Sequence, residues 1–263
     1  MTPAQKSLID SISRVLSADT RVESAWLSGS FGRGEADEWS DVDVTVVAFD
    51  RTFDQAVAAY ANDLSAIANV VYMNVISGRV VNAVTDEWAR FDLTFLKPAE
   101  FARAMGPMSP LFNRNPTGPK PQTPPAYQAS AQRVTAIVSE YLRILGLSPV
   151  VLGRGEYLVA LDGVGHMRRL LIELFLEEAG ISQAARGGAL HMNRFLTEDQ
   201  RRALTSSPPL EATRESVLAA QEHLTRLFLP TARALARKTG ASWPSSFEDA
   251  TRRTLEKNLA LEI

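Results

Sequence analysis

The chain has 263 residues, of which 45% are apolar and 22% are charged, and its formal net charge is −2. This balance is typical of a soluble globular protein, and the length suits one large domain or two smaller ones. The absence of cysteine excludes disulfides, thiolate metal sites and cysteine nucleophiles. A nearly neutral charge without any Lys/Arg tract argues against a nonspecific nucleic-acid binder and favours a small-molecule partner.

The N-terminal segment MTPAQKSLIDSISRVL lacks the basic region and long apolar run of a signal peptide. No stretch of the sequence reaches the roughly 18 apolar residues that a membrane span requires. We therefore expect a cytoplasmic protein without membrane partners.

Helical and strand periodicities alternate in the N-terminal part of the sequence. Helices are predicted from Thr2-Pro3 onward and at 52–68, and strands at 22–28, 41–48, 70–76, 80–84 and 90–96. This order of elements is typical of an α/β or α+β domain.

The composition changes after this region. Seven of the fourteen prolines lie between Gly106 and Pro125, where we expect neither helix nor sheet to continue. The rest of the chain has helical periodicity, with helices predicted at 128–145, 156–179, 197–204, 210–238 and 246–261 and a break or kink at Pro230. The sequence thus predicts an α+β chain with a mixed-sheet domain (1–105), a proline-rich linker or loop (106–126) and an all-helical domain (127–263).

A glycine-rich turn follows the first predicted strand. It reads Leu-Ser-Gly-Ser-Phe-Gly-Arg-Gly over residues 27–34. Such a turn lets backbone N–H groups approach an anion without obstruction by side chains. The Ser30 hydroxyl can add a donor, and Arg33 can reach a triphosphate, although a solvated loop arginine is an equally good explanation.

Two carboxylates, Asp41 and Asp43, stand two residues apart at the start of the next predicted strand. The twofold period of a strand places both on one face, where hard oxygen ligands suit Mg²⁺. Asp92 is flanked by large apolar residues in Phe-Asp-Leu-Thr-Phe, as expected for a carboxylate that projects from a sheet into a site. Three carboxylates can hold two metal ions for in-line displacement at phosphorus.

This set of residues resembles the motif of the polymerase-beta-like nucleotidyltransferase superfamily. Gly29 and Ser30, a spacer of about ten residues, the pair Asp41 and Asp43, and a later Asp92 occupy the corresponding places. The resemblance covers roughly residues 24–96. A helical second half is similar to the plan of bacterial aminoglycoside and lincosamide nucleotidyltransferases.

The resemblance implies Mg²⁺, with two ions, and ATP or another NTP as co-substrate. Gly29, Ser30 and Arg33 would bind the triphosphate, and Asp41 and Asp43 would bind metal. Asp92 would bind a second metal, accept a proton from the acceptor hydroxyl, or do both. The α-phosphorus would be attacked and pyrophosphate released, so the expected product is an acceptor carrying an NMP, with an antibiotic-like small molecule as one possible acceptor.

Other charged residues lie in the helical half. Glu156, Asp162 and Glu173 can form an acidic wall for a cationic acceptor, and His166, Arg168 or Arg169 can contact phosphate, although solvated helix faces explain both groups more simply.

Three alternatives to small-molecule transfer stay open. The same fold can modify a protein side chain, as in antitoxin-type nucleotidyltransferases. It can also be a polymerase or RNA-tailing enzyme, which the missing basic signal disfavours. A catalytically inactive nucleotide-binding regulatory module is disfavoured by the intact carboxylate trio.

Overall fold

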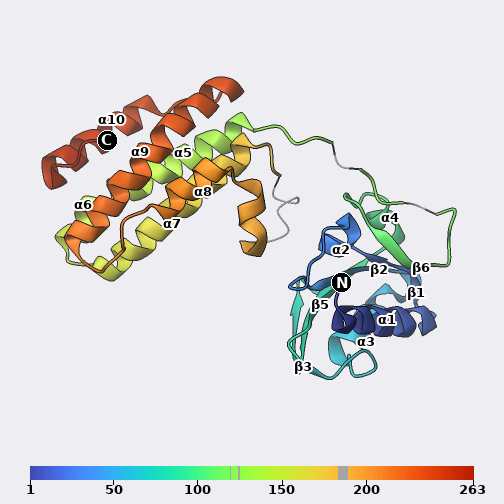
Figure 1. Cartoon of the computed structure of the whole chain (residues 1–263). Helices are drawn as coiled ribbons and strands as arrows, with labels where there is room; N and C mark the ends of the chain where they lie inside the picture. Colours follow the sequence, from blue (N-terminus) through green and yellow to red (C-terminus); the bar gives the residue numbers. More distant parts are fainter. Residues whose placement is uncertain (119, 124, 183–188) are drawn as a thin grey trace. The chain divides into compact units, whose positions relative to one another are not determined.

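The computed structural model describes residues 1–118, 120–123, 125–182 and 189–263. Pro119 and Pro124 of the predicted proline-rich linker lie outside the described residues. The chain divides into two compact units, Met1–Pro125 and Ala126–Ile263, which Figure 1 colours from blue to green and from green to red.

The first unit contains a six-stranded sheet in the order β3-β4-β5-β2-β1-β6. Only β2 and β5 are parallel, and every other neighbouring pair is antiparallel, so the sheet is mixed as predicted. Its strands are β1 (Val22–Leu27), β2 (Val42–Ala48), β3 (Val70–Ile76), β4 (Val80–Thr85), β5 (Arg90–Leu96) and β6 (Ser109–Asn113). Its helical segments are α1 (Pro3–Ala18), α2 (Gly29–Arg33), η1 (Asp50–Thr52), α3 (Phe53–Asn62) and α4 (Pro98–Phe101).

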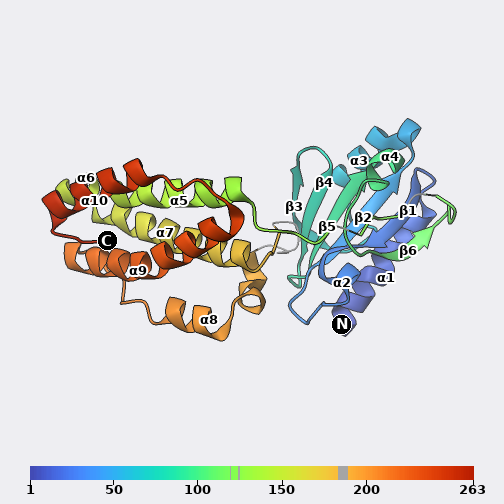
Figure 2. The same ribbon diagram turned by 90° about the horizontal axis from the view of Figure 1, so that it is seen from above.

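The two long helices of this unit, α1 and α3, cover one face of the sheet (Figures 1 and 2). Alternate residues of β2 and β5 point into the core beneath them, including Val44, Val46, Leu93 and Phe95. The twofold strand period therefore turns the intervening polar residues toward the opposite face. That second face is covered at one end by α4, where Phe101 packs on Trp26 and Val47.

The described part of the second unit contains helices and no strands, as predicted. Its described elements are α5 (Ala131–Gly146), α6 (Ser148–Gly153), α7 (Tyr157–Glu178), η3 (Ala189–Phe195), α8 (Glu198–Thr205), α9 (Arg214–Thr239) and α10 (Ser245–Leu259). Its core contains a stacked Tyr141–Phe228 pair with ring centroids 3.7 Å apart. The run Ala131–Gly153 is long and apolar enough to cross a membrane by length and composition alone, but its apolar side chains, such as Leu142, help to form this core.

Two expectations about these elements were wrong. The proline-rich stretch does contribute to the sheet, because β6 pairs with β1. Its Pro110 is tolerated because β6 is an edge strand, where a missing N–H donor can face away from the sheet. Of the break or kink expected at Pro230, the break is not found, because α9 is continuous from Arg214 to Thr239.

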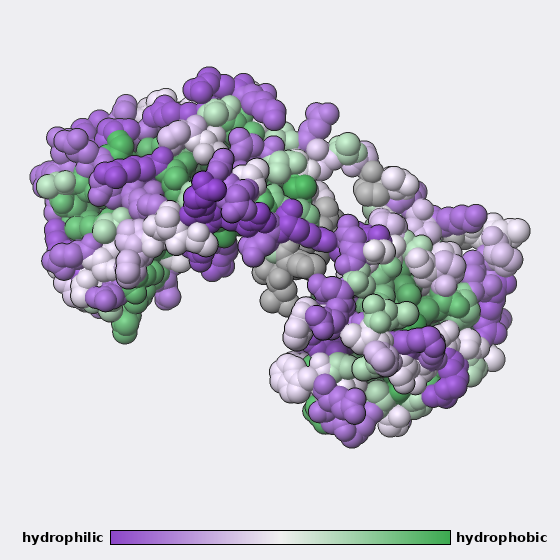
Figure 3. Space-filling model, in the orientation of Figure 1, coloured by the Kyte–Doolittle hydropathy of each residue, from purple (hydrophilic) through white to green (hydrophobic). Residues whose placement is uncertain are grey.

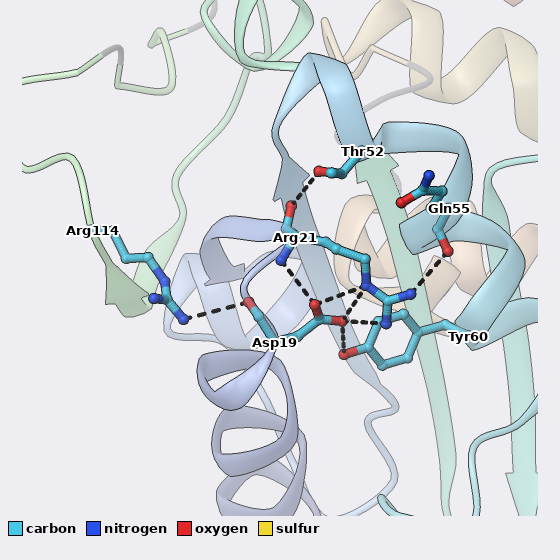
Figure 4. Close-up of polar contacts among 6 residues, drawn as sticks. All are labelled: Asp19, Arg21, Thr52, Gln55, Tyr60 and Arg114. Atoms are coloured by element: carbon cyan, nitrogen blue, oxygen red, sulfur yellow. Dashed lines mark hydrogen bonds and ion pairs between the residues drawn. The ribbon is translucent and has the colours of Figure 1, made fainter.

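A partly buried ion pair ties the end of α1 to α3 (Figure 4). The Asp19 carboxylate accepts hydrogen bonds from the Arg21 guanidinium at 2.7 Å and from the Tyr60 hydroxyl at 3.0 Å. Arg21 also donates to the backbone oxygen of Gln55. Burial would raise the pKa of Asp19, but the hydrogen bonds from Arg21 and Tyr60 outweigh it, and the pKa is lowered.

We predict that Asp19→Asn destabilises the first unit by about 1.5–3 kcal/mol, the usual value of hydrogen bonds to a charged group. The folded-state pKa is lowered, so the stabilisation is present above the unfolded pKa of about 4 and is lost as the pH falls through the folded value. In urea unfolding, the free energy of unfolding of the variant should be clearly lower than that of wild type at pH 7, and the difference should be much smaller at pH 3. Asp10→Asn is the matched control, because Asp10 pairs with Lys6 on the surface and should matter by less than about 1 kcal/mol.

Candidate functional site

The predicted carboxylates meet on the open face of the sheet, at the parallel pair of strands. Asp43 of β2 lies directly opposite Asp92 of β5 in the β-ladder. Asp41, two residues before Asp43, comes from the loop that leads into β2. The pKa of Asp43 is raised to about 6 by burial first and by the charges of Asp41 and Asp92 second. The three acidic groups therefore share one partly desolvated region.

The glycine-rich turn packs against the same carboxylate. Gly29 has a φ of +55°, and a Cβ on it would lie 1.8 Å from Oδ2 of Asp43. The Ser28 N–H also donates to the backbone oxygen of Asp43 at 2.9 Å. A glycine is thus required both by the left-handed backbone and by the approach of the Asp43 side chain. The turn predicted to hold phosphates and the strand predicted to hold metal touch each other.

Ser30 and Arg33 both belong to α2, the single helical turn that follows Gly29. The Ser30 hydroxyl is buried and has no hydrogen-bond partner in the part of the chain that the structure describes, which leaves a donor available for an anion beside Gly29. Arg33 forms an ion pair with Glu35 at 2.8 Å. Its charge also acts on Asp43, whose pKa it lowers against the larger effect of burial.

Gly32 reveals why the proline-rich stretch belongs to this site. A Cβ on Gly32 would lie 2.7 Å from the backbone oxygen of Leu27 and equally close to that of Pro107. The turn is therefore packed between the end of β1 and the segment before β6. The sequence placed Gly32 in a glycine-rich turn that an anion can approach, and the structure adds that close packing requires a glycine at this position.

Several residues of the site carry no signal in the sequence. Asn82 of β4 lies opposite Asp92 in the β-ladder and hydrogen-bonds its carboxylate, which lowers the pKa of Asp92 against the larger effect of burial. Asn74 of β3 lies opposite Asn82 in the neighbouring β-ladder. Arg90 lies 3.8 Å from Asp41 and donates to the backbone oxygen of Trp39. Only the strand register could have identified these residues.

The loop before Asp41 is fixed from α1. The side-chain amide of Gln5 donates to the backbone oxygens of Asp37 and Ser40 at 2.8 and 2.9 Å. Gln5 is itself held in a capping box with Thr2 at the start of α1. A buried glutamine on the first helix therefore positions the loop from which Asp41 emerges.

The donor set suits a hard cation. Among the described residues, no group of three or more His, Cys, Asp or Glu side chains forms a ready-made metal centre. The carboxylates repel one another as like charges, and Arg90 lies 3.8 Å from Asp41. Their oxygen chemistry nevertheless fits Mg²⁺, and Asp41 and Asp43 are the residues that would hold it.

Comparison with known proteins agrees with this geometry. Residues 9–91 match the family model for the nucleotidyltransferase domain. The first unit is a nucleotidyltransferase domain. The predicted superfamily and the enzyme class, a nucleotidyltransferase, are thereby confirmed. The match spans the turn, β2 with Asp43, and α3, and it ends one residue before Asp92 of β5.

Two solved structures are similar over nearly the whole chain. An aminoglycoside 6-adenyltransferase from Bacillus subtilis is 15% identical, with 95% of each chain covered and a TM-score of 0.45. A nucleotidyltransferase-like protein from Exiguobacterium sibiricum is 12% identical, with 96% of this chain and 88% of the other covered and a TM-score of 0.39. No curated protein matches significantly.

We predict that Gly29→Ala weakens Mg–NTP binding by about tenfold or more, because the new methyl group would displace the Asp43 carboxylate. Gly34→Ala is a closely matched control. Gly34 also has a left-handed φ, +71°, but a Cβ there would meet nothing within 4 Å. Both variants should lose similar stability from backbone strain. Equal NTP affinities of the two folded variants, measured by calorimetry, would refute the role of Gly29 beside Asp43.

Proposed function

We propose that the chain transfers an NMP, with ATP as the first candidate donor, to a hydroxyl of a small acceptor. The observation that carries this proposal is the contact of Gly29 with Asp43 and the pairing of Asp43 with Asp92. A phosphate-binding turn and an acidic face are thereby joined at one place. Asp41 and Asp43 would hold Mg²⁺, and Asp92 would share in binding a second ion.

The chemistry follows from these positions. The acceptor oxygen attacks the α-phosphorus, an O–P bond forms, and the bond between the α-phosphorus and the bridging oxygen of pyrophosphate breaks. Bound Mg²⁺ would neutralise charge on the triphosphate and on the leaving group. Ser30 would donate to a phosphate oxygen. Asp92, whose pKa is raised by burial, is suited to accept the acceptor proton, and Asn82 would fix the direction of its carboxylate.

A small acceptor is favoured by the net charge of −2 and by the acidic face around Asp43. A polynucleotide would bring phosphates and would require a basic surface. The helical unit is the proposed acceptor-binding domain, and an aminoglycoside or lincosamide hydroxyl is a first candidate. Incubation with labelled NTPs, Mg²⁺ and a set of such acceptors tests the proposal through pyrophosphate release. Label appearing on the protein itself, or on another protein, would favour side-chain modification instead.

We predict that Asp43→Asn abolishes transfer and makes the metal-free protein more stable at pH 8. The folded-state pKa of about 6 lies above the unfolded value, so the wild-type protein loses stability as the pH rises through 6. After allowance for partial exposure, the variant should gain about 1 kcal/mol at pH 8 and little at pH 4. Melting curves in EDTA at both pH values measure this. Turnover within tenfold of wild type would remove Asp43 from the metal site.

We predict that Asp92→Asn slows the single-turnover chemical step by roughly 10²–10⁴ while NTP binding survives. If Asp92 acts mainly as a base, the variant is slow at every Mg²⁺ concentration. If Asp92 acts mainly as a metal ligand, added Mg²⁺ partly restores the rate of the variant. We expect a mixed result, with partial rescue. A rate near wild type across the whole Mg²⁺ series would exclude Asp92 from the site.

A further inference from the structure

The helical unit contains a pocket of its own, formed by the end of α5, by α6, by the start of α7 and by α9. Its volume is about 250 Å³, slightly below the roughly 300–1,000 Å³ of pockets for drug-sized ligands. The lining is mostly apolar and includes Ile144, Leu147, Val151, Leu152, Val159 and Ala160. A fragment-sized apolar group fits this space, and a polyhydroxylated sugar does not match its lining.

Two buried polar side chains in the pocket wall each have an oxygen without a hydrogen-bond partner among the described residues. Ser148 and Gln221 are each 3% exposed. The two atoms are the hydroxyl oxygen of Ser148 and the side-chain oxygen of Gln221. An unsatisfied buried acceptor costs stability, so a ligand that donates a hydrogen bond would recover part of that cost. The amide oxygen of Gln221 can only accept, which sets the polarity of the ligand group.

The mouth of the pocket adds a negative charge. Asp162 of α7 lines the pocket and is exposed, and His166 lies one turn further along the same helix. Two of the apolar lining side chains are themselves exposed, Val159 at 54% and Leu147 at 44%. Figure 3 shows hydrophobic surface at this end of the helical unit, where α6 and the start of α7 lie. A cationic head and an apolar body would complement these surfaces.

The pocket depends on the absence of a side chain at Gly163. The residue lines the pocket from within α7, and a Cβ there would meet only Ile144, at 3.8 Å. Glycine is the least favourable non-proline residue in a helix interior. Gly165, two residues along, is exposed, and a Cβ on it would meet nothing within 4 Å. At position 163, therefore, a side chain would fill the space between α5 and α7.

We propose that this pocket binds a small apolar amine, whose ammonium group donates to Gln221, Ser148 or Asp162 and whose body occupies the apolar lining. The site lies within the helical unit and its occupation does not require NTP or transfer. Binding can therefore be measured whether or not the proposed function is correct.

The test uses the full chain without NTP and compares three ligands of one shape: phenethylamine, 2-phenylethanol and 3-phenylpropionate. Calorimetry or protein-observed NMR should show the amine binding most tightly and the carboxylate most weakly. Gly163→Leu should weaken amine binding by about tenfold or more, because leucine fills the pocket. Gly165→Leu is the matched control on the same helix and should leave binding unchanged. Both replacements favour helix formation, and melting curves check the fold.

Gly163→Ala provides a milder variant, with one added methyl group in ordinary contact with Ile144, and should give a smaller loss. Gln221→Met should weaken binding of the amine and the alcohol together while leaving the fold as stable or more stable, because an unpaired buried oxygen is removed. The proposal is overturned by equal amine binding in Gly163→Leu and wild type, by equal binding of the carboxylate, or by a concentration-dependent dimer that excludes the amine.

Discussion

The parallel pairing of β2 with β5 places two carboxylates, Asp43 and Asp92, side by side on a partly buried face. Burial raises the pKa of both groups, so ionisation of either carboxyl group is less favourable here than in water. Neighbouring polar and positively charged groups partly offset this effect of burial. Arg90 and Arg33 lower the pKa of Asp43, and the amide of Asn82 lowers that of Asp92, without cancelling the effect of burial. The remaining charge imbalance is what a divalent cation would neutralise.

Rigid support is needed because like charges push the acidic side chains apart. The turn at Gly29 admits no side chain, and Gly32 is packed between two backbone oxygens. The loop before Asp41 is fixed by Gln5. Away from the site, the Asp19–Arg21 pair ties α1 to α3, which cover the core face of the sheet. The interactions that stabilise the unit thus lie on the core face of the sheet, and the mutually repelling carboxylates lie on the open face.

The strands of the site could be predicted because polar and apolar residues alternate along them, as β5 shows from Arg90 to Phe95. Strand pairing could not be predicted, and so Asn82, which depends on the β4–β5 register, was missed. The five-residue α2 is too short to have a period. The helix predicted at 52–68 ends at Asn62, because the Asp63 carboxylate accepts from the Ser65 N–H and starts a turn. Such local hydrogen bonds compete with the helix in a way that apolar periodicity does not register.

The two units hold different kinds of recognition chemistry. In the nucleotidyltransferase domain, the site is built from charge: carboxylates, a bare turn and the unpartnered hydroxyl of Ser30. In the helical unit, the pocket is apolar, with acceptors at Gln221 and Ser148 and a single carboxylate, Asp162, among its lining residues. A site that would bind phosphate oxygens through charge and metal does not by itself distinguish one acceptor from another. Shape and hydrogen-bond polarity do carry such information, since a ligand that leaves Gln221 unpaired gives up a bond that a matching one forms. Discrimination among ligands is therefore expected from the pocket of the helical unit, and binding of the triphosphate from the acidic face of the sheet.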